Sequence, residues 1–161
     1  MSIRPQIAVL TAASVLVFLG AWGFEALGYA PCQLCYWQRY PHYAAAAIGV
    51  VALLLPLRFF AYLGALALGT TSAVGFYHTG VERHWWPGPA SCTGGGVDPN
   101  LSAADLLEQL QTAPLVRCDE IPWRLSDWVP LEFLDLTMAN FNAVGSLVLA
   151  LAWLAVARSR G

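Results

Sequence analysis

Residues 59–81 read FFAYLGALALGTTSAVGFYHTGV, and this is one of four long stretches of the chain without a charged side chain. The other three are residues 5–24, 40–57 and 136–157. An α-helix rises about 1.5 Å per residue and a bilayer core is about 30 Å thick, so about 20 apolar residues suffice to cross it. The pattern therefore predicts an all-α membrane protein, a four-transmembrane-helix bundle.

The expected helices follow these stretches, at about residues 7–28, 41–55, 59–79 and 136–157. The second stretch is the weakest, because 18 residues cover only about 27 Å at the helical rise. Small residues suit close packing of helices in a membrane. They occur at Ala44–Gly49 and at Gly64, Gly69 and Gly75.

The composition supports a single membrane domain over residues 1–161. Hydrophobic residues make up 58% of the chain and charged residues 11%, whereas soluble domains are about 25% charged. Any one stretch could be a buried soluble helix, but too little polar sequence remains to cover four. The net charge of −2 gives no reason to expect nucleic acid as a partner. The first stretch resembles a signal peptide, yet its apolar run continues through Trp22 and Phe24, so we expect a retained helix.

The arginines predict the orientation in the lipid bilayer. Four helices put both termini on one side, which carries no acidic residue and four arginines: Arg4, Arg58, Arg158 and Arg160. Basic residues near helix ends mark the cytoplasmic side. We therefore expect a multi-pass protein of the bacterial inner membrane with both termini cytoplasmic. The outer loops, at about 30–40 and 80–135, then face the periplasm, where disulfides persist.

The long outer loop contains a shorter helical pattern. Ser102–Asp105 has the form of a capping box, with Asp in the place of Glu. It opens an apolar row at Leu106, Leu107 and Leu110. We expect a short amphipathic helix, which lies on the membrane surface or folds over the ends of the bundle.

All four cysteines lie in the expected outer loops, where three pairings are open. Cys32 and Cys35 form a CxxC motif at the outer mouth of the second helix, and Arg39 lies one helical turn beyond Cys35. A helix N-terminus and a guanidinium both favour a thiolate. We therefore interpret the motif as a redox dithiol, with a stabilising disulfide as the alternative. Pro41 is expected to interrupt the helix near Trp37–Tyr40.

Cys92 and Cys118 are the second candidate pair, in an acidic loop. A structural disulfide is the simpler interpretation of an isolated pair of this kind. However, the glycines at 94–96 are expected to leave Cys92 exposed and movable. An exposed bond of this sort suits attack by another protein's thiolate.

His78 ends the third helix at the expected level of Cys35 and Arg39. The three side chains would meet where a quinone head group rests: His78 could donate to a quinone oxygen, and Arg39 could stabilise negative charge. A histidine that is simply hydrated is the plain alternative, and His42 and His84 look incidental. No metal is expected, since zinc would require further ligands at suitable spacing.

In combination, these motifs resemble the DsbB family of disulfide-bond formation proteins over nearly the whole chain. The resemblance rests on the four helices and on Pro31-Cys32-Gln33-Leu34-Cys35, Gln38-Arg39, Tyr77-His78, the Cys92/Cys118 loop and Cys118-Asp119-Glu120-Ile121-Pro122-Trp123. The glutamines at 33 and 38 stand at positions that often differ in the family. The resemblance implies a protein-dithiol:quinone oxidoreductase that uses ubiquinone or menaquinone from the membrane pool.

The family's mechanism also implies a role for each matching residue. A DsbA-like periplasmic thioredoxin-fold partner would attack the Cys92–Cys118 bond at Cys92. Cys118 would then attack Cys32, and the released Cys35 thiolate would pass electrons to the quinone through a charge-transfer contact. Arg39 would support this thiolate, and His78 would be a quinone neighbour.

Two other functions remain open at this stage. One is a dedicated thiol oxidase for a single partner. The other is a non-enzymatic membrane protein whose disulfides only stabilise the outer loop.

Overall fold

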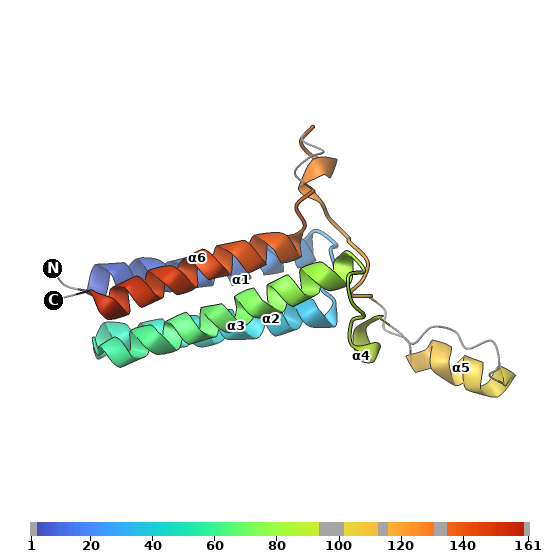
Figure 1. Ribbon diagram of the computed structural model, residues 1–161, viewed down its shortest axis with the longest axis horizontal. Coiled ribbons are helices and arrows are strands. Elements are labelled where there is room, and N and C mark those ends of the chain that lie inside the picture. Colours follow the sequence, from blue (N-terminus) through green and yellow to red (C-terminus); the bar gives the residue numbers. More distant parts are fainter. Residues whose placement is uncertain (1–2, 94–101, 113–115, 131–134, 160–161) are drawn as a thin grey trace.

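The computed structural model describes residues 3–93, 102–112, 116–130 and 135–159, and these residues form helices and no strand. The four long helices are α1 (Arg4–Ala26), α2 (Gln33–Leu54), α3 (Arg58–Glu82) and α6 (Met138–Arg158). They lie side by side as a bundle, with both chain termini at one end (Figure 1). Helix α3 packs against α2 and α6, and α1 packs mainly against α2. The expected all-helical fold is therefore confirmed.

Three of these helices, α1, α3 and α6, are long and apolar enough to cross a membrane. Helix α2 is not among them, which agrees with the weakness of its apolar stretch in the sequence. The membrane character of the chain thus rests on three helices, and the fourth crossing stays a prediction.

The bundle is apolar on its outside and partly polar inside, the reverse of a soluble protein. Val9, Leu16, Leu66 and Val148 are each at least 60% exposed. Buried polar side chains include Thr11, Ser14, Gln38, His42, Thr71, Ser72 and Ser146. Polar groups inside a membrane protein usually face the bundle interior, where they find hydrogen-bond partners. The distribution therefore suits a bundle surrounded by lipid.

Two of the three glycines expected at close helix contacts in α3 do lie at such contacts. A Cβ on Gly64 would come within 2.7 Å of the Trp153 ring, and one on Gly75 within 2.9 Å of the Ala143 backbone. Both neighbours belong to α6, so these glycines let α3 and α6 approach. A Cβ on Gly69 would meet nothing within 4 Å, so the expectation for Gly69 was wrong.

Helix α2 begins at Gln33, eight residues before its expected start at about residue 41. The expected outer loop at 30–40 is therefore mostly helix, and Cys35 and Arg39 lie in α2 rather than in a loop. Pro41 lies inside the helix without ending it. A proline removes the backbone donor to the carbonyl four residues earlier, which here is that of Trp37. The next carbonyl, of Gln38, accepts a hydrogen bond from the Thr71 hydroxyl of α3 at 2.7 Å, which joins α2 to α3 beside the proline.

The segment between α3 and α6 carries α4 (Ala90–Thr93), α5 (Ala103–Thr112) and the 3-10 turn η1 (Leu125–Asp127). Helix α5 lies beyond the bundle, at the end opposite the termini (Figure 1). It begins directly after Ser102, whose Oγ accepts from the Asp105 amide at 3.3 Å. Its position on a membrane surface stays a prediction. The Leu110 side chain and Gly94–Gly96 lie outside the described residues.

Candidate functional site

The two cysteine pairs lie at the same end of the bundle. Cys92 and Cys118 form a disulfide with their Cα atoms 5.4 Å apart, while Cys32 and Cys35 are free thiols with their sulfurs 3.1 Å apart. Both residues of the disulfide are fully buried. The expectation that Cys92 is exposed was therefore wrong. The pair packs with Cys32, Leu34 and Val81 in an apolar cluster that closes this end of the bundle.

Cys32 directly precedes α2 and caps its N-terminus. Its Sγ accepts a hydrogen bond from the Cys35 backbone N–H at 3.3 Å. The hydrogen bond from the Cys35 thiol, helped by His78, lowers the pKa of Cys32 to about 5 against the opposing effect of burial. Hydrogen bonds to a charged form favour that form, and a helix N-terminus adds to the effect. Of the two thiols, Cys32 is therefore the one whose thiolate form these hydrogen bonds stabilise.

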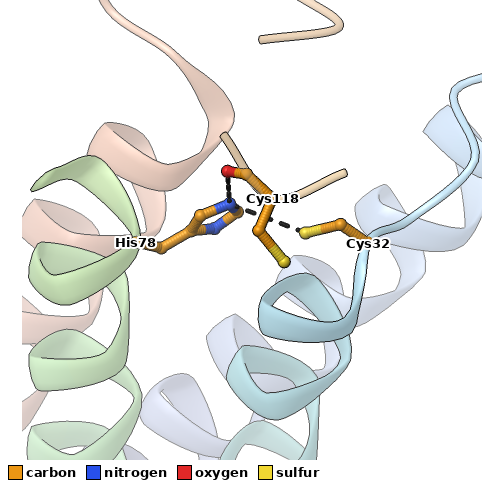
Figure 2. A group of neighbouring side chains, drawn as sticks. All are labelled: Cys32, His78 and Cys118. Carbon is orange, nitrogen blue, oxygen red and sulfur yellow. Dashed lines mark hydrogen bonds between the residues drawn. The ribbon is translucent and has the colours of Figure 1, made fainter. Parts of the chain in front are cut away.

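His78 lies beside one cysteine of each pair, Cys32 and Cys118 (Figure 2). Its Nε2 is 3.5 Å from Cys32 Sγ and 3.2 Å from the Cys118 carbonyl oxygen. The sulfurs of Cys32 and Cys118 and a ring nitrogen of His78 all lie within 4.8 Å of one another. The histidine therefore contacts both pairs at once. Its expected contact with a quinone stays a prediction.

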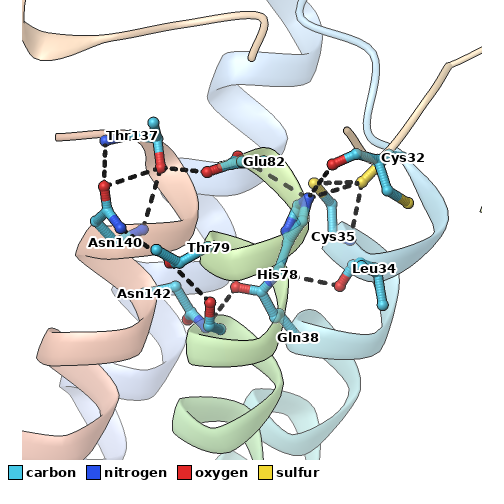
Figure 3. A network of polar contacts seen from close by, with 12 residues as sticks. Cys32, Leu34, Cys35, Gln38, His78, Thr79, Glu82, Thr137, Asn140 and Asn142 are labelled. Carbon is cyan, nitrogen blue, oxygen red and sulfur yellow. Dashed lines mark hydrogen bonds and ion pairs between the residues drawn. The ribbon is translucent and has the colours of Figure 1, made fainter. Parts of the chain in front are cut away.

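A polar network extends from His78 into α2 and α6 (Figure 3). The Gln38 amide nitrogen lies 2.8 Å from His78 Nδ1, and the Asn142 amide donates to Gln38 Oε1 at 2.8 Å. On the other side, Glu82 Oε1 is 3.9 Å from His78 Nε2. The Thr137 hydroxyl donates to Glu82 Oε2 at 2.6 Å. The network holds His78 from three helices.

Arg39 is directed toward α1 rather than toward the cysteines. Its NH1 donates to Glu25 Oε2 at 2.7 Å and its NH2 to the Ala21 carbonyl at 3.3 Å. The guanidinium also lies 5.2 Å from the centre of the Tyr36 ring, within the range of a cation–π contact. Arg39 is buried and Glu25 half-exposed. This arrangement joins α1 to α2 one turn below Cys35.

A small cavity of about 30 Å³ lies beside Cys32, Cys35 and His78. The polypeptide over it is the 116–123 stretch, which contributes Arg117 and Glu120. A space of this size holds a water molecule and excludes a quinone ring.

Four residues of this site were missed or undervalued by sequence reasoning. From the sequence, Glu82, Glu25 and Asn142 were given no role, and His42 was treated as incidental. Glu82 lies four residues after His78, which puts both on one face of a helix, and Asn142 is a polar residue inside an apolar stretch; both signals were readable. His42 is buried, and its Nε2 contacts Asn142 Oδ1 and Ser146 Oγ, each at 3.1 Å.

The group Cys32, His78 and Cys118 also has the residue types of a metal site. Cys118 is held in the disulfide with Cys92, and a disulfide sulfur is not a thiolate ligand. The arrangement in this structure is therefore that of one dithiol and one disulfide, with His78 in contact with both.

The family model described as "Disulfide bond formation protein DsbB" matches residues 3–156. No curated protein and no solved structure matches the chain. The family match covers all four long helices except the last two residues of α6, and all four cysteines. The family is one of disulfide-forming oxidoreductases, and three apolar helices fit an inner-membrane protein. We conclude that this chain belongs to the DsbB family of disulfide bond formation proteins.

Proposed function

We propose that this protein oxidises a DsbA-like periplasmic thioredoxin-fold protein and passes the electrons to membrane quinone. The observation that carries the proposal is the meeting of two cysteine pairs at one end of the bundle. The sulfurs of Cys32 and Cys118 lie within 4.8 Å of each other, although 86 positions of sequence separate them. Disulfide exchange requires such an approach of one sulfur to the other.

The proposed relay begins at the Cys92–Cys118 bond. A thiolate of the partner attacks Cys92 Sγ, so that a partner–Cys92 disulfide forms and Cys118 leaves as a thiolate. The second thiol of the partner then attacks the mixed disulfide, which releases oxidised partner and the Cys92 thiolate. Because Cys92 is fully buried, the short segment around α4 must move before the first attack.

The second half of the relay uses Cys32 and Cys35 in their oxidised form. The Cys118 thiolate attacks Cys32 Sγ, a Cys118–Cys32 bond forms, and Cys35 leaves as a thiolate. The Cys92 thiolate then attacks Cys118, which restores the Cys92–Cys118 bond and leaves Cys32 and Cys35 reduced. The bonding in the structure, with Cys92–Cys118 joined and both other thiols free, is compatible with this final state and supports the proposal.

The residues around Cys35 have the chemistry that a quinone requires. Cys35 is half-buried, and the neighbouring Tyr36 and Trp37 rings are about two-fifths exposed on the outer side of α2. Arg39 supplies a buried positive charge one turn away. When bound, ubiquinone or menaquinone supplies the two-electron acceptor. The water-sized cavity on the inner side is too small for the ring, so we assign the ring to the lipid-facing side, with Cys35, Arg39 and the aromatic residues as its neighbours.

The proposal includes four membrane crossings with both termini in the cytoplasm. Helix α2 has 22 residues, and this length covers about 33 Å at the helical rise. The outer turns of α2 carry Cys35 and Arg39. A membrane helix tolerates an arginine near its end when the charge is paired, as Arg39 is with Glu25. Cysteine-accessibility labelling at Leu57 and at Trp128, each replaced in turn by cysteine in a cysteine-free background, tests this orientation.

Quinone reduction by the purified protein with a reduced DsbA-like partner tests the function directly. We expect turnover with a benzoquinone or a naphthoquinone, and the preferred one identifies the cofactor. Folded wild-type protein that reduces neither quinone would contradict the proposal. In the Cys118→Ala variant, the Cys92 thiolate should instead attack the disulfide of added oxidised partner, which forms a partner–Cys92 disulfide and releases one partner thiol. This mixed disulfide should accumulate, because Cys118 is no longer there to displace the partner from Cys92.

Two alternatives give different results in the same assays. A dedicated oxidase would turn over with one partner and ignore general DsbA-like proteins in a partner-swap assay. A non-enzymatic protein with structural disulfides would trap no thiol protein in the Cys118→Ala variant.

A further inference from the structure

The two ring nitrogens of His78 both face groups whose hydrogen-bonding roles are fixed. The inference drawn from this rests on the proposed function, because it concerns how Cys32 acts in the relay. It starts from a general property of histidine: which nitrogen carries the proton is set by the partner of the other.

On the first side, His78 Nε2 faces acceptors. The Cys118 carbonyl oxygen, 3.2 Å away, can only accept a hydrogen bond, so His78 Nε2 can bond it only when it carries a proton. Cys32 Sγ at 3.5 Å and Glu82 Oε1 at 3.9 Å are the other neighbours of the same nitrogen. The proton therefore lies on Nε2.

On the second side, His78 Nδ1 faces a donor. The Gln38 amide nitrogen lies 2.8 Å away and also donates to the Leu34 carbonyl at 3.1 Å, so the nitrogen end of this amide is fixed by a backbone acceptor. The oxygen end accepts from Asn142 Nδ2 at 2.8 Å. That nitrogen is itself fixed, since it donates to the Thr71 carbonyl at 3.3 Å. The chain of amides therefore presents an N–H to Nδ1 and leaves it no acceptor.

We propose that His78 is a catalytic residue that acts on sulfur: a neutral Nε2–H donor to Cys32, held in this tautomer by Gln38 and Asn142 as positioning residues. The same N–H bonds the Cys118 carbonyl and so holds the second pair against the first. A general base at this position would need an unprotonated Nε2. The Gln38 N–H that faces Nδ1 disfavours this, because it keeps the ring proton on Nε2. A metal on Nε2 would require a proton on Nδ1, where it would meet the Gln38 N–H.

The consequence for the relay is a more oxidising Cys32–Cys35 bond. A hydrogen bond to the Cys32 thiolate stabilises the reduced pair, and a pair whose reduced form is stabilised is a stronger oxidant. Such a bond accepts electrons more readily from Cys118. Among the described residues that line the cavity beside Cys32, the charged ones are Glu82 on α3 and Arg117 and Glu120 from the covering segment, whereas Met138 and Ala139 on α6 are uncharged.

The equilibrium of the Cys32–Cys35 pair with glutathione tests the proposal. In this reaction, two glutathione thiols reduce the bond, and one glutathione disulfide forms. The background is Cys92→Ser with Cys118→Ser, which keeps the Cys118 carbonyl and leaves one pair to titrate. We expect His78→Ala and His78→Asn to lower the equilibrium constant for reduction about tenfold, which is about 30 mV. His78→Gln, whose amide nitrogen reaches the position of Nε2, should stay within about threefold of wild type.

His84→Asn is the matched control, because His84 is exposed and lies outside the network. It should leave the equilibrium unchanged. An unchanged equilibrium in His78→Ala would overturn the proposal, and so would a His78→Gln value as low as that of His78→Ala, which would indicate a purely structural histidine.

Nitrogen-15 spectra of labelled histidines test the tautomer itself. We expect the wild-type His78 ring to be protonated at Nε2 and bare at Nδ1 at neutral pH. Gln38→Glu should add a proton at Nδ1, because a carboxylate accepts where the amide donated. Wild-type protein with its proton on Nδ1 would refute the assignment. Neither experiment uses a quinone or a protein partner, so either can fail while the proposed function stands, and the converse also holds.

Discussion

The half of the bundle near the chain termini and the half near the cysteines are filled by different kinds of side chain. Near the termini, Trp153 packs with small and aliphatic residues of α1, α2 and α3, among them Ile7, Ala52 and Ala61. Near the cysteines, the interior holds hydrogen-bonded polar groups on α2, α3 and α6: Gln38, His78, Glu82, Asn142 and Thr137.

The difference indicates which half can change without loss of function. Lipid is as apolar as leucine, so helices in a membrane associate by close packing and by hydrogen bonds rather than by the hydrophobic effect. Close packing holds the helices together in the half near the termini, and it depends only on the shapes of the side chains. Hydrogen bonds hold the half near the cysteines, and they also decide proton positions and charge. Variants in the two halves should therefore fail in different ways.

The largest expected effect is that of Arg39→Ala on quinone reduction. Loss of one preorganised charge typically slows a reaction about 100-fold or more, and we expect a decrease of this order. Exchange between the cysteine pairs should persist, since Arg39 is directed to Glu25 and Ala21 rather than to a sulfur. Stopped-flow quinone reduction and acid-quenched thiol trapping measure the two steps separately.

Two further variants sharpen the test of Arg39. Arg39→Lys should fall between wild type and Arg39→Ala, because lysine keeps the charge and loses the planar fork. Arg83→Ala is the control: Arg83 pairs with Asp135 at 2.8 Å and is half-exposed. If Arg39→Ala slowed exchange and quinone reduction equally, Arg39 would only hold α1 against α2.

The second prediction concerns the pH dependence of stability in the half near the cysteines. The folded pKa of Cys32 is about 5, and that of an unfolded cysteine is about 8.5. The stabilisation by the thiolate is therefore complete above about pH 8.5 and is lost as the pH falls through 5, with a slope of at most about 1.4 kcal/mol per pH unit.

Unfolding of the reduced protein against its Cys32→Ser variant measures this slope. Both proteins carry Cys92→Ser and Cys118→Ser, so that no disulfide of the second pair is present to exchange with Cys32 or Cys35. The difference in unfolding free energy should grow from pH 5 to pH 8. A constant difference over this range would mean that Cys32 is not a thiolate in the fold.

How much of this contrast could be predicted from the sequence differs between the halves. The charge-free stretches gave the four long helices, and Gly64 and Gly75 were recognised as close contacts, because helix length and residue size are local properties. Gly69 was misjudged because size alone does not say which side of α3 faces α6.

The half near the cysteines was predicted in its residues and less well in its geometry. The two cysteine pairs and His78 were identified, and they do come together. The burial of Cys92 was not predicted. It depends on contacts with Cys118 and with Cys32, which lie 26 and 60 positions away in the sequence. The start of α2 was misplaced because Pro41 was expected to break the helix. The hydrogen bond from the Thr71 hydroxyl to the Gln38 carbonyl, beside this proline, is a contact between helices that periodicity does not contain.

The third prediction distinguishes the hydrogen bond that Glu82 accepts from Thr137 from the negative charge of Glu82. Glu82→Ala leaves the buried Thr137 hydroxyl without its acceptor, and an unsatisfied buried group costs about 1–3 kcal/mol. We expect a loss of stability of about 2 kcal/mol. Glu82→Gln keeps an oxygen for Thr137 and should lose less than half of this. Glu120→Gln is the exposed control: it removes only a surface ion pair with Arg117, and it should change stability by less than about 0.5 kcal/mol. Equal losses in both Glu82 variants would show that charge, and not the hydrogen bond, stabilises this corner.

The smallest expected effect lies in the half near the termini and compares two glycines of α3. Gly64→Ala puts a methyl group within 2.7 Å of the Trp153 ring, and overpacking of this kind costs about 1 kcal/mol or more. Gly69→Ala meets nothing within 4 Å, so it should leave stability unchanged or raise it slightly through helix propensity. Unfolding in mixed micelles measures both. Exchange between the cysteine pairs should be equal in the two variants, because shape, and not proton position, is all that this half contributes. Slower exchange in Gly64→Ala alone would mean that the packing of Trp153 is transmitted along α3 to His78, and the two halves would then act as one unit.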